Sequence, residues 1–376
     1  MSRADYASLA RSLGADDRPA ARAALARVAG DATFADTVRR HHLSHLLFAT
    51  LPEDELRAAL PPPAFDALRE WLRRPRSSPA DDVRAIDEVQ TALRRHGIDC
   101  MVLKGLYFAH RLYRGLERRA QYDVDLVTRR RDFTRASRVL ADLGFVERWR
   151  DLHSVTWRRG ADNLDLHSCF RNVPAYRLDE DRIWRDRVSY TIGDLSFTTP
   201  SDEDTLVLLV LSLFQDIGLG SAKLKQLVDV VLLVAAIDRS FDWGRFFARR
   251  APEKTLPVAV NVLDFAVRVF DVATSVPRLA ATLAGHADVL AVREREQALA
   301  LLFAERSAPA NKAWFFRIYP GSVARYWLWL LPRKLPLYLK GQAPGRGPSS
   351  MRPSLATLRL LLGAPWRDPP PPRRVE

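Results

Sequence analysis

Cysteine and long apolar runs are what this sequence has least of. Only two of the 376 residues are cysteine, Cys100 and Cys169, and they form no C-x-x-C pair. This argues against a disulfide framework and a cysteine-based zinc site, and it is typical of a protein from a reducing compartment. No run reaches the roughly 18 apolar residues that cross a bilayer, and the N-terminus lacks an apolar signal core. We therefore expect a cytoplasmic protein without a membrane-spanning segment.

Acidic residues are scarce at the C-terminal end. The net charge is +13, and residues 312–376 hold twelve Lys or Arg against two acids, so +10 of the total lies there. The end is also rich in Pro and finishes in PPPPRRVE, a composition typical of disorder. Its aromatic residues alternate with basic ones, which suits peripheral contact with an anionic membrane. The interpretation that we favour is a helix whose aromatics cover the helical domain and whose arginines face water, and single-stranded nucleic acid is the weakest alternative.

The remaining sequence is that of a globular protein with several parts. A hydrophobic content of 47% over 376 residues allows a sizeable core and two or three domains. Hydrophobic periodicity predicts a helical N-terminal region over 1–86, an α/β domain over 87–200 and a helical domain over 201–308. The basic tail, partly disordered, covers 309–376.

The α/β region is predicted from a change of period after Gly97. Short apolar or alternating runs favour strands, and apolar residues at three- and four-residue spacing favour helices. The order is strand, helix, strand, helix and hairpin, with a second hairpin after it. These elements are expected at 98–103, 105–115, 122–127, 132–144, 153–168 and around 193–194.

Paired carboxylates on one predicted strand suggest a metal site. Asp123 and Asp125 are separated by one residue, so on a strand they project to the same face. Such oxygens suit Mg²⁺, which keeps further positions for water and substrate phosphates. Asp165, on the predicted hairpin, is the expected third acid, although Asp162 in the adjacent turn competes with it. His167 shares the face of Asp165, and we read it as a strand histidine rather than a catalyst.

Four segments, in this order, resemble an uncharacterised bacterial nucleotidyltransferase family of the polymerase-beta-like superfamily. They are LKGLYFAHRLY, RAQYDVDLV, RASRVLADLGF and NLDLH. The resemblance implies an α+β fold, in which a small mixed-sheet nucleotidyltransferase core is flanked by helical N-terminal and C-terminal regions. It also implies that Gly105 is a turn glycine over the nucleotide, that Asp123 and Asp125 hold two metal ions, and that Asp165 completes the site.

The turn before the helix at 105–115 suits a phosphate. Free backbone N–H groups, a close approach at Gly105 and the charge of Lys104 would all favour an anion there. Leu106 stands where the superfamily usually has serine, so one phosphate contact must come from elsewhere. Arg118 or Arg119, just before the paired aspartates, is the expected source.

Downstream, Lys225 and Asp229 lie one helical turn apart. They are expected either to touch the nucleotide or to form an ion pair with each other. The resemblance implies a Mg²⁺-dependent transferase, with two ions, that moves a nucleoside monophosphate from an NTP to a hydroxyl-type acceptor. We expect ATP as the donor and a small metabolite, peptide or glycan as the acceptor. Phosphoryl transfer at the same metal site, or a catalytically decayed nucleotide-binding protein, are the alternatives.

Overall fold

The computed structural model describes most of the chain. The described residues are 2–73, 78–113, 115–119, 123–150, 153–170, 175–306, 308–322, 324, 326 and 328. Residues Met1–Pro320 form one compact unit, and Gly321–Glu376 form a second. Most of the predicted basic tail therefore lies outside the described residues, and its membrane or nucleic-acid contacts stay predictions. Within the described residues no helix is both long and apolar enough to cross a membrane.

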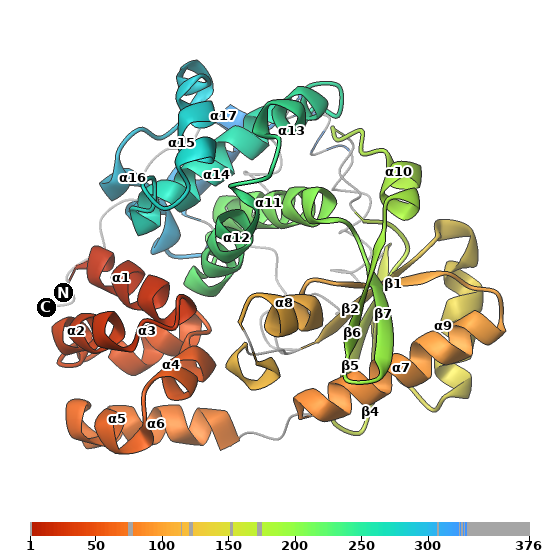
Figure 1. Cartoon of the computed structure of the whole chain (residues 1–376), viewed down its shortest axis with the longest axis horizontal. Helices are drawn as coiled ribbons and strands as arrows, with labels where there is room; N and C mark the ends of the chain where they lie inside the picture. Colours follow the sequence, from red (N-terminus) through yellow and green to blue (C-terminus); the bar gives the residue numbers. More distant parts are fainter. Residues whose placement is uncertain are drawn as a thin grey trace, which may run out of the picture. The chain divides into compact units, whose positions relative to one another are not determined.

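The N-terminal region is helical, as its sequence predicts (Figure 1, red to orange). His42 has a φ of 56°, and this left-handed residue divides the apolar pattern at 33–51 into two helices. The neighbouring His41 is fully buried, and its Nδ1 accepts a hydrogen bond from the backbone N–H of Leu224, 3.2 Å away. The helices are α1 (Arg3–Gly14), α2 (Arg18–Val28), α3 (Phe34–Arg40), α4 (Ser44–Thr50), α5 (Glu53–Ala59) and α6 (Pro62–Arg73).

A mixed five-stranded sheet forms the centre of the α/β region. The strand order is β1-β2-β5-β4-β3, in which β2 and β5 are parallel and the other neighbours are antiparallel. The sheet confirms the predicted fold class, including the hairpin whose turn holds Gly160 at a φ of 58°. The strands are β1 (Cys100–Leu103), β2 (Val124–Thr128), β3 (Val146–Arg150), β4 (Ser154–Arg159) and β5 (Asp162–His167).

Two helices, α7 (Pro79–Arg95) and α9 (Phe133–Asp142), cover one face of this sheet (Figure 1). Their apolar residues share a buried core with Leu126 of β2 and Leu166 of β5. Because side chains alternate along a strand, the residues between these core positions face the opposite side. The predicted boundary after residue 86 falls inside α7, whose first turns already pack in this core.

The chain leaves the sheet through α10 (Glu180–Arg185) and a separate hairpin, β6 (Val188–Ile192) and β7 (Leu195–Thr199). The hairpin turns at Gly193, as predicted, with a φ of 58°. On the sheet face opposite α7, residues of β1, β2 and α10 pack with Leu208. This second core places the following helical region against the same sheet face as Asp125.

The helical region begins with a long apolar helix, α11 (Asp202–Leu219), which ends at Gly220 in a left-handed conformation with a φ of 64°. Part of the predicted tail belongs to this region, because the ring of Phe315 stacks on Phe214 with 4.5 Å between centroids. The remaining helices are α12 (Leu224–Ile237), α13 (Trp243–Arg250), α14 (Leu256–Phe270), α15 (Pro277–Ala284), α16 (Arg295–Leu302) and α17 (Pro309–Ile318).

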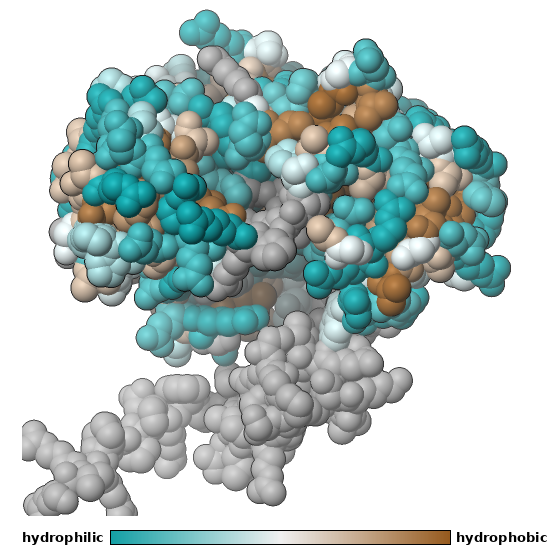
Figure 2. Space-filling model, turned by 90° about the horizontal axis from the view of Figure 1, so that it is seen from below, coloured by the Kyte–Doolittle hydropathy of each residue, from teal (hydrophilic) through white to brown (hydrophobic). Residues whose placement is uncertain are grey.

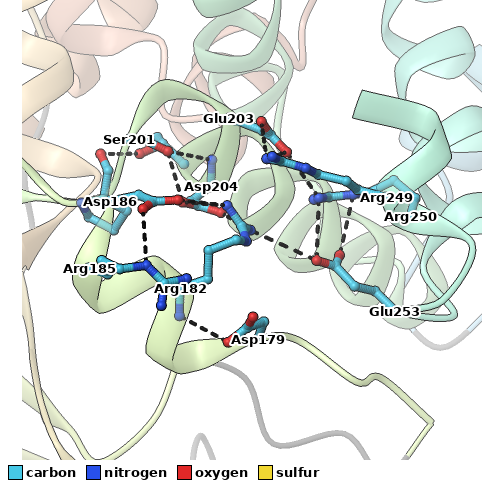
Figure 3. Close-up of polar contacts among 12 residues, drawn as sticks. Asp179, Arg182, Arg185, Asp186, Ser201, Glu203, Asp204, Arg249, Arg250 and Glu253 are labelled. Atoms are coloured by element: carbon cyan, nitrogen blue, oxygen red, sulfur yellow. Dashed lines mark hydrogen bonds and ion pairs between the residues drawn. The ribbon is translucent and has the colours of Figure 1, made fainter. Parts of the chain in front are cut away.

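An ion network attaches α10 to the helical region (Figure 3). Arg182 donates to the buried carboxylate of Asp204 at the start of α11, and its guanidinium lies 3.8 Å from Glu253. Arg250, fully buried, pairs with Glu253 at 3.3 Å and with Glu203 at 3.2 Å. Because these charges are mostly withdrawn from water and paired, the network fixes how the segment after the sheet meets α11 and α13.

One surface of the molecule is shown in Figure 2. Hydrophilic residues predominate there, and the hydrophobic patches are separated from one another.

Candidate active site

Asp125 and Asp165 are brought together by the pairing of two neighbouring strands. β2 and β5 run parallel, and Asp125 lies opposite Asp165 in their register. The flanking residues Val124 and Leu126, like Leu164, are buried in the core shared with α7 and α9. Both carboxylates therefore project from the other face of the sheet, where they stand side by side as the sequence predicts.

The environment of Asp165 disfavours the negative charge of its carboxylate. Its Oδ1 is buried and has no hydrogen-bond partner among the described residues. Burial is the largest cause that raises the pKa of Asp165, and the negative charge of Asp125 raises it further. A hydrogen bond from the side chain of Thr156 and the nearby charge of Lys104 act in the opposite direction. A half-buried acid with one buried, unpartnered oxygen is a feature of functional sites rather than of stable packing.

Asp123 directly precedes β2 and keeps an exposed surface. Crowding by surrounding protein atoms is nevertheless the largest cause that raises its pKa to about 6. Repulsion by Asp125 and Asp165 raises it further, whereas Lys104 and Lys225 lower it. Asp123 thus lies close enough to feel the other two charges, and its role as a metal ligand stays a prediction.

His167 lies with the two paired aspartates. Its Nε2 is 2.9 Å from Oδ1 of Asp125. One ligand atom each from Asp125, Asp165 and His167 fall within 4.8 Å of one another, a grouping that could hold a metal ion. Asp123 is not a member of this group. The arrangement differs from the predicted set of three aspartates, because β5 places His167 two residues beyond Asp165 on the same face.

Lys104 occupies the turn between β1 and helix α8 (Gly105–Arg111) in an unusual conformation. Its φ of 50° and ψ of −94° lie near the strained γ-turn region that side chains rarely adopt. The side chain donates to Oγ of Ser212 at 3.2 Å, and Nζ lies 3.9 Å from Oδ2 of Asp125. Strain of this kind collects at functional sites.

Gly105 and Leu106, the other two residues discussed for the predicted phosphate turn, lie at the start of α8. Gly105, half-buried, is the first residue of α8 and does not have a positive φ, so the strained residue of this turn is the lysine before it. Leu106 is buried in the core beneath the sheet. The position at which the superfamily usually has serine therefore contributes to packing in this chain.

Both predicted phosphate arginines are bound to protein groups. Arg118 donates to Asp16 at 2.6 Å and to Thr50 at 3.2 Å. Arg119 makes a two-pronged ion pair with Asp229, at 2.9 and 2.8 Å, and both side chains are almost completely buried. The geometry assigns these arginines to the attachment of the N-terminal and helical regions, so we leave them out of the substrate site.

Lys225 is the cation that α12 brings near the acids. Its predicted ion pair with Asp229 is absent from the contacts of the described residues, because Arg119 occupies that carboxylate. The ammonium has no hydrogen bond or ion pair among the described residues. Burial, then the charge of Arg119, lowers the pKa of Lys225 to about 7, while Asp229 and Asp123 counteract this.

Sequence reasoning missed one member of the site and undervalued another. Ser212, the partner of Lys104, comes from α11, 108 residues further along the chain, and no local pattern marks it. The sequence did indicate that His167 lies near the site, because its spacing from Asp165 places both side chains on the same face of the strand. Asp162, the competing third acid, lies at the other end of β5, where it contacts Arg159 at 3.4 Å.

This chain is weakly similar to known proteins of solved structure. The solved structures that match include two nucleotidyltransferase-type proteins, and both likenesses are weak and concern the fold alone. The antibiotic-resistance factor ANT(2'')-Ia is 14% identical, with a TM-score of 0.37, and the match covers 47% of this chain and 94% of that one. An antigenic nucleotidyltransferase-like protein from Paracoccidioides brasiliensis is 19% identical, with a TM-score of 0.33, over 49% and 94% of the two chains. No curated protein matches.

The family itself is identified by a match of a different kind. Residues 29–271, more than half of the chain, match the family described as uncharacterised nucleotidyltransferase. The matched range contains β1, β2 and β5 with Asp125 and Asp165, together with α11 and α12. The predicted enzyme class is thereby confirmed. This protein belongs to the uncharacterised nucleotidyltransferase family.

Proposed function

We propose that this protein transfers a nucleoside monophosphate from an NTP, with ATP as the expected donor, to a hydroxyl-type acceptor and releases pyrophosphate. The acceptor is expected to be a small metabolite, a peptide or a glycan, and the cytoplasm is the expected compartment. The proposal depends on a divalent metal ion at the aspartates, for which Mg²⁺ is the ion predicted from the sequence.

The observation that carries the proposal is the register pairing of Asp125 with Asp165. Two carboxylates held side by side repel each other, and the buried Oδ1 of Asp165 has no hydrogen-bond partner among the described residues, which adds a further cost. A divalent cation relieves both at once. The donor set therefore fits a metal ion held by Asp125 and Asp165, with Asp123 as the third predicted ligand.

Two lysines are available for the phosphates. Lys104 lies beside Asp125, and Lys225 approaches from α12 with no partner in the described chain. A charged side chain kept partly out of water without a partner costs stability, so its retention favours a role in binding. We assign both ammonium groups to the triphosphate, where they would hold the leaving pyrophosphate.

The acids and the metal divide the chemistry between them. When bound, the metal supplies positive charge for the triphosphate and lowers the pKa of the attacking hydroxyl. Asp165, whose pKa is raised by burial and by Asp125, is the expected acceptor of the hydroxyl proton. Lys104, held by Ser212, keeps a positive charge next to Asp125 before the substrate arrives.

Slow transfer to water tests the reaction without knowledge of the acceptor. ATP labelled at the α- or γ-phosphate is incubated with the protein and Mg²⁺ or Mn²⁺, and the products are separated. We expect AMP and pyrophosphate from the wild type and neither from Asp125→Asn. ADP and phosphate would contradict the proposal in favour of phosphoryl transfer. Metal-dependent binding of ATP without any product, including with added candidate acceptors, would favour a decayed nucleotide-binding protein.

A further inference from the structure

The two carboxylate oxygens of Asp125 face different groups. Oδ1 lies 2.9 Å from Nε2 of His167, and Oδ2 lies 3.9 Å from Nζ of Lys104. Because the ammonium of Lys104 is close to Oδ2, a cation that binds through Oδ1 lies on the side of His167. On that side the next carboxylate is Asp165, whose Oδ1 is buried and unpartnered among the described residues.

The spacing of these three side chains suits a single ion. Their ligand atoms fall within 4.8 Å of one another. With bonds of about 2.1 Å in an octahedral shell, adjacent ligand atoms are roughly 3 Å apart and opposite ones roughly 4.2 Å apart. Small side-chain rotations therefore bring Asp125, Asp165 and His167 to a common ion. The ring of His167 is accessible for this, because 28% of its side chain is exposed.

We propose that Nε2 of His167 is a metal ligand, so that the ion shared by Asp125, Asp165 and His167 is a divalent transition metal such as Mn²⁺ rather than Mg²⁺. This inference rests on the proposed function, because it names the metal of the same carboxylate site. Mg²⁺ strongly prefers oxygen ligands, whereas imidazole nitrogen favours transition metals. The ligand set proposed here thus consists of the carboxylates of Asp125 and Asp165 and the imidazole nitrogen of His167.

The competing role for His167 is that of a positioning residue. In that case Nε2 carries a proton, donates it in a hydrogen bond to Asp125 and never contacts the metal. The two roles predict different spectra, because only a bound imidazole places a nitrogen next to the ion. They also predict different metal preferences, since a positioning histidine affects Mn²⁺ and Mg²⁺ alike.

Binding of Mn²⁺ to the full chain, without nucleotide, separates these roles. Four proteins are compared: wild type, His167→Gln, Asp165→Asn and the matched control His110→Gln, whose histidine is exposed on α8. Melting temperatures confirm that each variant is folded. Calorimetry gives the affinities for Mn²⁺ and Mg²⁺, and pulsed electron paramagnetic resonance detects nitrogen coupled to bound Mn²⁺.

We expect nitrogen coupling in the wild type and in His110→Gln, and none in His167→Gln. The affinity of His167→Gln for Mn²⁺ should fall at least about tenfold, with a smaller change for Mg²⁺. Mn²⁺ that binds the wild type without nitrogen coupling would overturn the inference and leave the carboxylate site intact. Mn²⁺ binding that is unchanged in Asp165→Asn, or absent from the wild type, would instead refute the proposed metal site itself.

Discussion

Arg119 and Asp229, which are 110 residues apart in the chain, form a two-pronged ion pair that is almost completely buried. Tyr113 donates a further hydrogen bond to the same carboxylate at 2.6 Å. The pair joins the segment before β2 to α12, so it sets the position of Lys225 relative to the aspartates. Arg119→Met leaves Asp229 buried without its cation, and we expect a loss of about 3–5 kcal/mol in the free energy of unfolding. Chemical denaturation measures it.

The double variant Arg119→Met, Asp229→Leu tests whether the pair acts as a unit. Removing both charges should cost much less than the sum of the single changes, because neither charge is then left buried alone. Arg84→Ala, which removes an exposed contact to Asp81 on the same helix, is the control and should leave stability nearly unchanged. A stable Arg119→Met protein that had lost nucleotide affinity would instead support the phosphate role predicted from the sequence.

Lys225 should make stability depend on pH. Its pKa is lowered to about 7 in the folded protein, whereas an unfolded lysine titrates near 10.4. Between these values the unfolded chain binds more protons, so stability rises as the pH increases from about 7 to about 10. Lys225→Met removes the cost, and it should raise the melting temperature most at pH 6 and least at pH 10.

The same variant should weaken nucleotide binding. Loss of one charge-assisted contact is expected to lower the affinity for ATP with a divalent ion roughly tenfold. Lys312→Met, on α17, serves as the control for both measurements. If Lys225→Met is no more stable than the wild type at pH 6, the lysine has a partner that offsets its burial, and our assignment to the triphosphate loses its support.

Much of the site is visible in the sequence because it depends on local patterns. A two-residue period placed Asp125 on a strand face away from the core, and the turn at Gly160 placed Asp165 on the next hairpin. The register of the parallel strands β2 and β5 then places these two aspartates opposite each other. The strands and their flanking helices followed from the same periodicities, whereas the mixed-sheet core was implied by the family resemblance.

The remaining contacts join residues that are far apart in the chain, and local patterns do not encode them. Arg119 precedes the aspartates directly, so a phosphate role was a reasonable prediction, but Asp229 from α12 holds it. Ser212 reaches Lys104 in the same way, from α11. The composition of α17 resembles that of the tail, which is why the predicted boundary placed it there, but Phe315 packs on α11, as the alternative of a packed aromatic helix predicts.

Lys104 tests whether backbone strain is stored at the site. Glycine relieves the strain of a φ of 50° and a ψ of −94°, whereas alanine keeps it. Lys104→Gly should therefore be about 1 kcal/mol more stable than Lys104→Ala in chemical denaturation. Both variants should form less AMP, because both lose the ammonium beside Asp125.

At an ordinary helical position the order of stability is reversed, and alanine is more stable than glycine. Ala23→Gly, at an exposed site in α2, should lower stability by about 1 kcal/mol. If Lys104→Ala proves at least as stable as Lys104→Gly while this control behaves as expected, the turn before α8 is not strained.

The central claim is that Asp125 and Asp165 form the catalytic metal site. It is tested most directly by the rate of AMP and pyrophosphate formation from ATP in two variants of one strand, Asp165→Asn and Asp162→Asn. We predict that Asp165→Asn lowers the rate at least about 100-fold, because metal-assisted charge stabilisation is the main source of catalysis. Asp162→Asn, at the far end of β5, should leave the rate within about a factor of three, as expected of a surface contact. An unchanged rate in Asp165→Asn, or an equal loss in both variants, would contradict the account.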